Sequence, residues 1–583
     1  MDILKNVKDL ASKFSFSKKR EDRPQYDPAV DEPLVSFTIP PHHEELERYW
    51  VDEPYSFISI LLNKRDKTNV YYAIEPKLNR FEKTMLEEVL EILQDVLTLK
   101  GMPDIDKIKD ADKYELLREN TENILFGYSE LGPRSFEKIY YYVKRNFIEF
   151  GEIGPIMHDT HIEDIWCNGV GIPVYLCHTG YGNLNTNIVF PTDEQLDSFV
   201  MRIAQQSTRH LSKSTPILDT AMRDGSRINI TYGHEISPKG SSFSIRLQKK
   251  VPLTPLDLIA WGTFSSDLMA YFWLCMESGK NILFCGGTAT GKTSSLNAIC
   301  MFIPLNIRIV TLEDTREIQL AHENWIPTVT RSGLAGQEIS KVDLEDLLRA
   351  SLRQRPEYLL VGEVRGRESQ ILFQAMNAGH ATCSTFHAGT PGEVLNRFTN
   401  PPINVPPAMF TALDILCVQT NVYDKGVEKR RVDRVAEVIG VTTQVDIKEV
   451  FAWNPIEDNF IMETSHVLAD IMRRRGWNNK NLDDELNRRV LFMETLIEKG
   501  IRDYNVLIRW IDAYHKDPEK VISVLTTETI PDVSHAIGSI EPEDATGPEG
   551  RAVPGGITVP DDTTVPDHTT VLDENTEPEK SMR

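Results

Sequence analysis

The stretch NILFCGGTATGKTSSLNAIC, Asn281 to Cys300, decides the fold of this chain. Its centre, from Gly286 to Thr293, fits the pattern G-x-x-x-x-G-K-[ST]. Glycines let such a loop turn its backbone N–H groups toward phosphate oxygens, and the N-terminus of the following helix adds positive potential there. The apolar run before the loop predicts a buried strand, and SSLNAICMFI after it predicts a helix. The stretch is therefore expected to be a strand, loop and helix that bind the phosphates of a nucleotide.

The roles within this loop follow from the chemistry of each side chain. We expect Lys292 to reach the β and γ phosphates, and the Thr293 hydroxyl to ligate the Mg²⁺ ion that bridges them. The residues expected to contact the nucleotide are Gly286, Gly287, Thr288, Ala289, Thr290, Gly291, Lys292, Thr293 and Ser294.

Two later apolar runs end in acidic residues, as hydrolysis of a nucleotide would require. In EYLLVGEVRG the apolar run ends at Glu363, which is placed to help hold magnesium beside the phosphate loop. In RIVTLEDTREI the apolar run is followed by Glu313, Asp314 and Glu317. One of these acids could orient or deprotonate the attacking water.

Two histidines flank a further apolar strand in NAGHATCSTFHAGTPGE, namely His380 and His387. A zinc site is disfavoured because no cysteine or acid falls at a matching ligand spacing. A histidine that contacts the γ phosphate or a neighbouring chain fits the segment better.

Composition excludes several other classes of protein. The chain of 583 residues carries 64 Lys and Arg against 87 Asp and Glu, a net charge of −23, which disfavours a wide nucleic-acid-binding surface. It contains no apolar run of about 18 residues and no signal-peptide core, so a soluble, cytoplasmic protein is expected. The 7 cysteines are scattered without a C-x-x-C pair, which predicts buried, reduced thiols.

The chain divides into four predicted segments. Residues 1–35 are a basic N-terminal segment and linker, in which the first twenty residues could form an amphipathic docking helix or a solvated terminus. Residues 36–246 alternate helical and strand patterns, as in an α+β domain, and VPLTPLDL (Val251 to Leu258) is the expected hinge into the next domain. Residues 247–520 alternate strands and helices, which predicts a parallel sheet closed by a C-terminal helical appendage. Residues 530–583 are a Pro-, Thr- and acid-rich tail that is expected to be disordered.

The order of the four motifs GGTATGKT, TLEDTRE, LLVGEVRG and GHATCSTFH resembles the Walker A, Asp box, Walker B and His box of the type II/type IV secretion ATPase superfamily. Further segments, among them IEDIWCNGVGIPVYL and LLRASLRQRPEYLLVGEVRG, resemble its archaeal branch, which includes the archaellum motor ATPase and pilus-assembly relatives. The resemblance covers roughly Ser36 to Pro518. It implies an α/β fold with a RecA-like P-loop NTPase domain that hydrolyses ATP with Mg²⁺.

The resemblance also implies roles for individual residues. Glu317 becomes the catalytic glutamate, Glu363 the Walker B acid near the metal, and His387 the His-box residue. Arg227 and Arg246 match the arginines that the N-terminal domain of family members contributes to the nucleotide, with surface ion pairs as the alternative.

The family further implies partners and a location. We expect a homo-hexamer at the inner face of the cell membrane that acts on a polytopic membrane platform protein, and through it on filament or pilin-like subunits, without nucleic acid. Thr315 stands where bacterial members usually have proline, as in the archaeal branch, and the paired C-x-x-C zinc module of many bacterial secretion ATPases is absent. A protein-export ATPase of the type II secretion kind, a nucleic-acid motor and a nucleotide-switched scaffold remain the alternatives.

Overall fold

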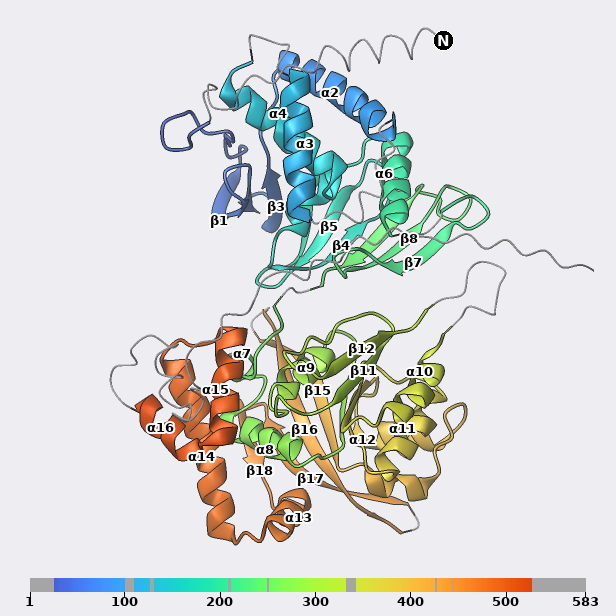
Figure 1. Ribbon diagram of the computed structural model, residues 1–583, viewed down its shortest axis with the longest axis vertical. Coiled ribbons are helices and arrows are strands. Elements are labelled where there is room, and N and C mark those ends of the chain that lie inside the picture. The colour runs from blue at the N-terminus through green and yellow to red at the C-terminus, as the bar shows by residue number, and fades with distance from the viewer. Residues whose placement is uncertain are drawn as a thin grey trace, which may run out of the picture.

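The computed structural model describes residues 26–99, 110–125, 131–207, 211–248, 251–331, 342–424, 427–442 and 444–526. These residues build two nine-stranded sheets, one from the N-terminal part of the chain and one from the C-terminal part (Figure 1). The predicted docking helix and the predicted disordered tail lie outside the described residues.

The N-terminal sheet has the order β1-β2-β3-β6-β5-β4-β9-β8-β7. Its neighbours pair antiparallel except β3 and β6, which pair parallel. The strands are β1 (His43–Asp52), β2 (Ser56–Asn63), β3 (Thr68–Ile74), β4 (Ile162–Cys167), β5 (Pro173–His178), β6 (Gly182–Val189), β7 (Ile217–Ala221), β8 (Arg227–Thr231) and β9 (Ser242–Arg246).

Helices cover this sheet in two groups, which confirms the predicted α+β architecture. Helix α6 packs Leu196, Phe199 and Ile203 onto the apolar residues of the sheet, while α2, α3 and α4 share a small core of their own. The helices are α2 (Arg80–Leu99), α3 (Asp110–Leu125), α4 (Pro133–Phe147), α5 (Gly154–Met157) and α6 (Asp193–Gln206). Leu34 and Val35 are buried against Phe57 and Ile74, so the packed domain starts slightly before the predicted boundary at residue 36.

The C-terminal sheet has the order β12-β11-β13-β14-β10-β15-β16-β17-β18. The strands from β12 to β15 are parallel, as the sequence predicted, and β16 to β18 extend the sheet as an antiparallel meander that the sequence did not reveal. The strands are β10 (Ile282–Gly286), β11 (Ile309–Glu313), β12 (Trp325–Val329), β13 (Tyr358–Val361), β14 (Ala381–Phe386), β15 (Ile415–Asp424), β16 (Val427–Val441), β17 (Val445–Asn454) and β18 (Asn459–Met462).

Both faces of the parallel sheet are covered by helices, which explains why β10, β11, β13 and β14 are buried along their whole length. Along β10, Ile282 and Phe284 face a core shared with α8 and α9, while Leu283 and Cys285 face a second core shared with α10, α11 and α12. The helices are α7 (Pro255–Ala260), α8 (Ser266–Glu277), α9 (Lys292–Cys300), α10 (Leu344–Ser351), α11 (Glu368–Asn377) and α12 (Pro391–Thr399). This doubly covered α/β sheet is the predicted fold class.

The predicted helical appendage is present and joins the first of these two cores. It consists of α13 (His466–Arg475), α14 (Asn479–Glu498), α15 (Tyr504–Lys516) and α16 (Pro518–Thr526). No helix among the described residues is long and apolar enough to cross a membrane.

The predicted hinge is wrong in its second half. The Thr254 side chain accepts a hydrogen bond from the Asp257 N–H, and the Asp257 carboxylate accepts one from the Thr254 N–H, which is a capping box. Pro255 stands at the first position of the helix, where a missing N–H costs nothing. The segment therefore begins helix α7 rather than bending freely.

Candidate functional site

The phosphate loop connects β10 to α9, as predicted, and its glycines are required by its geometry. Gly286 and Gly291 have φ angles of 154° and 89°, in the region that favours glycine. A Cβ on Gly286 would lie 2.5 Å from the Thr290 hydroxyl and 2.6 Å from the Gln419 carbonyl. The loop therefore cannot take a side chain at Gly286 without rearrangement.

Lys292 lies inside this loop. Its Nζ donates to the carbonyl oxygens of Gly286 (3.2 Å) and Gly287 (2.6 Å), and it lies 3.5 Å from His387 Nδ1. The residue is only 7% exposed, and burial lowers the pKa of its ammonium group. An anionic phosphate placed there would offer the ammonium a stronger partner than neutral carbonyls.

One cavity contains the phosphate loop together with the other predicted site residues. Its wall is formed by both parts of the chain: the loop and the acid-bearing strand ends come from the C-terminal part, and two arginines come from the N-terminal part. The predicted residues that line it are Arg227, Arg246, Thr288, Ala289, Thr290, Gly291, Lys292, Thr293, Ser294, Glu313, Asp314, Glu317, Glu363 and His387. Of the predicted residues, Gly286, Gly287 and His380 are not among its lining residues.

Glu363 follows β13 and lies at the centre of a small charged cluster. Its Oε2 accepts a hydrogen bond from Arg365 (2.6 Å), and its Oε1 lies 3.0 Å from His387 Nε2. Burial alone would raise the pKa of the Glu363 carboxyl, but the bond and charge of Arg365 outweigh burial and lower it. Glu363 is thus held as an anion, which is the form that binds Mg²⁺.

The second acidic cluster separates a buried acid from an exposed one. Glu313 is buried at the end of β11, and its Oε1 accepts the N–H groups of Glu317 (2.8 Å) and Ile318 (2.9 Å). Burial raises the pKa of the Glu313 carboxyl to about 7. The Glu317 side chain is exposed in the cavity, and Asp314 accepts a hydrogen bond from the Thr330 hydroxyl. Asp314 and Glu317 both line the cavity with exposed side chains. Of these two acids, Glu317 is the one whose backbone N–H is held by Glu313.

The two arginines are neighbours across strands β8 and β9, and each is paired with an acid of its own domain. Arg227 bonds both carboxylate oxygens of Asp219, at 3.0 and 2.8 Å, and Arg246 lies 3.1 Å from Asp164. The surface ion pairs that were the alternative for these residues are thus present, although both side chains line the cavity. A nucleotide would have to compete with Asp219 and Asp164 for them.

His380 and His387 do not form a common site. They flank opposite ends of β14, and His380 Nδ1 lies 2.8 Å from the Pro356 carbonyl, away from the cavity. Burial and the charge of Lys292 lower the pKa of His387, so this ring is neutral at pH 7.

Sequence reasoning missed several residues that line the same cavity, among them Arg430 and Glu163. Arg430 of β16 donates to the Ala289 carbonyl in the phosphate loop and to Glu163 of β4 in the N-terminal sheet. Arg430 lies in no recognised motif, because β16 itself was not predicted, and the run of three basic residues in EKRRVDRV was its one available signal. Glu163 lies in IEDIWCNGVGIPVYL, whose family resemblance implied no role for this residue.

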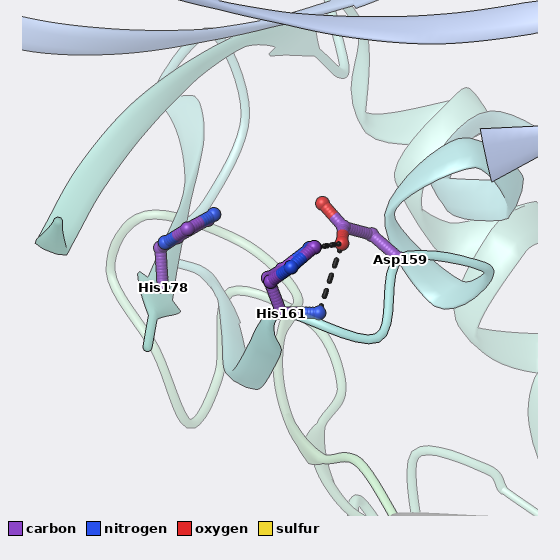
Figure 2. Close-up of side chains that lie close together, drawn as sticks. All are labelled: Asp159, His161 and His178. Atoms are coloured by element: carbon purple, nitrogen blue, oxygen red, sulfur yellow. Dashed lines mark hydrogen bonds and ion pairs between the residues drawn. The ribbon is translucent and has the colours of Figure 1, made fainter. Parts of the chain in front are cut away.

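A second polar cluster lies in the N-terminal domain, where Asp159, His161 and His178 point toward one another (Figure 2). Its hydrogen bonds argue against a metal site. His178 Nδ1 accepts the N–H of Gly180 (2.9 Å), so the proton of the neutral ring is on Nε2, the atom that faces Asp159 and Tyr49. A histidine that binds metal through Nε2 would instead donate from Nδ1.

The carboxylate of this cluster already has its partners. Asp159 accepts hydrogen bonds from the hydroxyls of Tyr49 (2.7 Å) and Tyr71 (2.9 Å) and from the N–H of His161 (2.9 Å). The cluster therefore ties the first strands of the sheet to the loop before β4, and we assign it a structural role.

Comparison with known proteins gives three matching family models. Residues 176–463 match the model described as Type II/IV secretion system protein. Residues 6–77 and 456–536 match models described as PilB3-like, N-terminal, and PilB3-like, C-terminal.

Two curated relatives come from the archaeon Methanocaldococcus jannaschii. The uncharacterized protein MJ0900 is 36% identical over 481 residues, which are 78% of this chain and 86% of that protein. The uncharacterized protein MJ1287 is 43% identical over 246 residues, 42% of this chain and 91% of that protein. Among solved structures, the VirB11 ATPase of the Brucella suis type IV secretion system matches with 22% identity and a TM-score of 0.26, over 49% of this chain and 91% of that chain.

Proposed function

The chain belongs to the type II/IV secretion system protein family and is an ATPase, and we propose that it works as a homo-hexameric motor that drives assembly or rotation of an archaeal type IV pilus-like filament. In this proposal the ring lies at the cytoplasmic face of the membrane and acts through a polytopic platform protein. The PilB3-like matches at both ends of the chain support the pilus-type branch of the family.

One observation carries the proposal. The phosphate loop, two acid-bearing strand ends and two arginines from a different sheet line a single cavity. A site built from two domains lets the bound nucleotide set the angle between them, which is what a motor needs.

The proposed chemistry begins with binding. The loop N–H groups and Lys292 would hold the β and γ phosphates, and Lys292 would give up its bonds to the Gly286 and Gly287 carbonyls. The Thr293 hydroxyl and Glu363 supply the hard oxygen ligands that suit Mg²⁺, which would neutralise charge on the phosphates.

The proposed hydrolysis then depends on two sets of side chains. Glu317 would orient the attacking water and accept its proton, while Glu313 fixes the Glu317 backbone. Arg227 and Arg246 would leave Asp219 and Asp164 to neutralise the charge that develops on the transferred phosphoryl group. Their movement would pull the N-terminal domain toward the nucleotide.

Ring formation provides the test of this function. ATPase rate should rise more steeply than protein concentration, and mass photometry in ATP and Mg²⁺ should show six-subunit particles over the same range. A rate that stays proportional to protein at all concentrations would contradict the ring. Stimulation by DNA would instead favour a nucleic-acid motor.

A further inference from the structure

Arg430 connects the phosphate loop to the N-terminal domain. Its Nε donates to the Ala289 carbonyl at 3.0 Å, and its Nη2 donates to Glu163 Oε2 at 3.2 Å. Its Cδ would lie 3.4 Å from a Cβ placed on Gly291, so the side chain lies directly against the loop. Among the described residues, this guanidinium therefore contacts loop and N-terminal sheet at once.

Glu163 lies beside the segment by which the chain leaves the N-terminal domain. It belongs to β4, and its carbonyl accepts the N–H of Leu247, the residue that follows β9. A force on the Glu163 side chain therefore acts close to the connection between the two sheets. On the same connection, Gln248 Nε2 donates to the Arg316 carbonyl at 2.9 Å.

Glu163 and a bound phosphate would compete for the positive charge of Arg430. Glu163 and the phosphate loop line one cavity, so a bound polyphosphate would bring several negative charges near this carboxylate. The same phosphates would attract the Arg430 guanidinium, because Arg430 lines this cavity too. At this short range, in a partly buried site, both effects weaken the ion pair between Arg430 and Glu163.

We infer that Arg430 is a nucleotide-responsive positioning residue: paired with Glu163 it fastens the N-terminal domain to the phosphate loop, and bound nucleotide draws it away from Glu163. This inference rests on the proposed function, because it assigns a trigger to the same cavity. It differs from the roles of Arg227 and Arg246, since Arg430 comes from the antiparallel meander of the ATPase domain itself.

Thermodynamic linkage makes the inference testable. If nucleotide weakens the Arg430–Glu163 pair, then removal of Glu163, which leaves Arg430 free to face the phosphates, should strengthen nucleotide binding by the same factor. Glu163→Gln should therefore lower the Kd for ADP about threefold, the size expected for a partly exposed ion pair. Removal of the arginine, in Arg430→Gln, should weaken binding because the loop loses a positive neighbour.

The matched control is Glu428→Gln. Glu428 is an exposed acid on the same strand, where it accepts a hydrogen bond from Asn421, and its neutralisation changes the net charge equally. It does not line the cavity. Fluorescent ADP titrations of wild type, Glu163→Gln and Glu428→Gln should show tighter binding for Glu163→Gln only.

Charge reversal distinguishes this role from a purely structural one. Distances between spin labels at Ser198 and Gln374, exposed residues of α6 and α11, would report the domain arrangement in a Cys177→Ser background. We expect Glu163→Arg to shift these distances and the double variant Glu163→Arg/Arg430→Glu to restore them. Nucleotide affinity should stay at least tenfold weakened in the double variant, because an acid now lies beside the phosphate loop.

The outcomes separate this inference from the proposed function. A wild-type protein that binds no ATP would overturn the function itself. A wild type that binds and hydrolyses ATP, with Glu163→Gln indistinguishable from Glu428→Gln in affinity and label distance, would overturn only the role of Arg430. Failure of the double variant to restore the distances would also overturn it.

Discussion

At the scale of single residues, the site depends on charged groups held in unusual surroundings. Lys292 is a buried ammonium bonded to the carbonyls of its own loop, and Glu313 is a buried carboxyl bonded to two backbone N–H groups. The surroundings of Lys292 affect how it binds phosphate, and those of Glu313 affect the pH at which it takes up a proton.

Lys292→Ala should weaken ATP binding at least about 100-fold, because charge-assisted hydrogen bonds to phosphate are lost. Titration with a fluorescent ATP analogue would measure the loss. Lys448→Ala is the matched control, since this lysine of β17 donates hydrogen bonds to Thr464 and lies outside the cavity. Equal affinities in the two variants would contradict the role of Lys292.

Glu313→Gln should change how stability depends on pH. Burial raises the pKa of Glu313 from 4.5 to about 7, so the native state binds a proton more tightly than the unfolded state. Wild type therefore loses stability as pH rises from 4.5 to about 7, by about 3 kcal/mol in total, and the glutamine variant lacks this loss.

Calorimetric melting temperatures at pH 5 and pH 8 would check this sign. The difference between variant and wild type should grow by about 5 °C toward pH 8. Glutamine keeps an oxygen that can accept the Glu317 and Ile318 N–H groups, so the loop should remain in place. A difference that does not change with pH would show that Glu313 titrates elsewhere.

The sequence predicted the residues whose motif implies a role, and missed Arg430 and Glu163, for which no motif implied one. Lys292, Glu317 and Glu363 follow from loop chemistry, strand ends and family resemblance, and all three line the cavity, although their roles remain predictions. Arg430 and Glu163 come together only because two domains meet, so no local pattern could indicate their pairing.

At the scale of elements, the C-terminal helices are fastened to the ATPase core by a buried arginine. Arg489 of α14 is 2% exposed, bonds Glu277 of α8 and Glu485, and stacks over the Trp273 and Tyr514 rings. The two partly buried carboxylates neutralise the buried Arg489 guanidinium, which offsets the cost of removing it from water.

Arg489→Met should destabilise the C-terminal domain by about 3–5 kcal/mol, because two carboxylates lose their buried partner. Arg488→Met is the control: this neighbour also pairs with Glu485 but is 31% exposed, and should cost at most about 1 kcal/mol. Urea unfolding followed by tryptophan fluorescence would compare them. Equal losses would show that Arg489 is not the essential fastening.

The elements were predicted where their pattern was strong. Four of the six parallel strands, β10, β11, β13 and β14, and the C-terminal helical appendage were correctly predicted. The edge strand β12 and the strands β15 to β18 were missed, and the charged residues of β16 and β17 obscure the alternation expected of a strand. The second half of the predicted hinge was wrong because Thr254 and Asp257 form a capping box and Pro255 begins helix α7.

At the scale of the whole molecule, the proposal is that the arginines of the N-terminal sheet couple domain movement to chemistry. Arg227→Ala or Arg246→Ala should lower kcat at least about tenfold and change the affinity for ADP little, if the arginines act on the transferred phosphoryl group. Arg223→Ala is the control, since Arg223 bonds the Gln206 carbonyl and does not line the cavity. A rise in KM with unchanged kcat would assign the arginines to binding alone.

The central claim is that ATP is hydrolysed in the cavity between the domains with Glu317 as the catalytic base. The most direct test is a comparison of single-turnover ATP hydrolysis with ATP binding for Glu317→Gln and for Glu323→Gln, an exposed acid outside the cavity. The account predicts that Glu317→Gln binds ATP like wild type but hydrolyses it at least about 100-fold more slowly, and that Glu323→Gln is unchanged. Hydrolysis at the wild-type rate in Glu317→Gln would contradict the account and move the catalytic role to another acid.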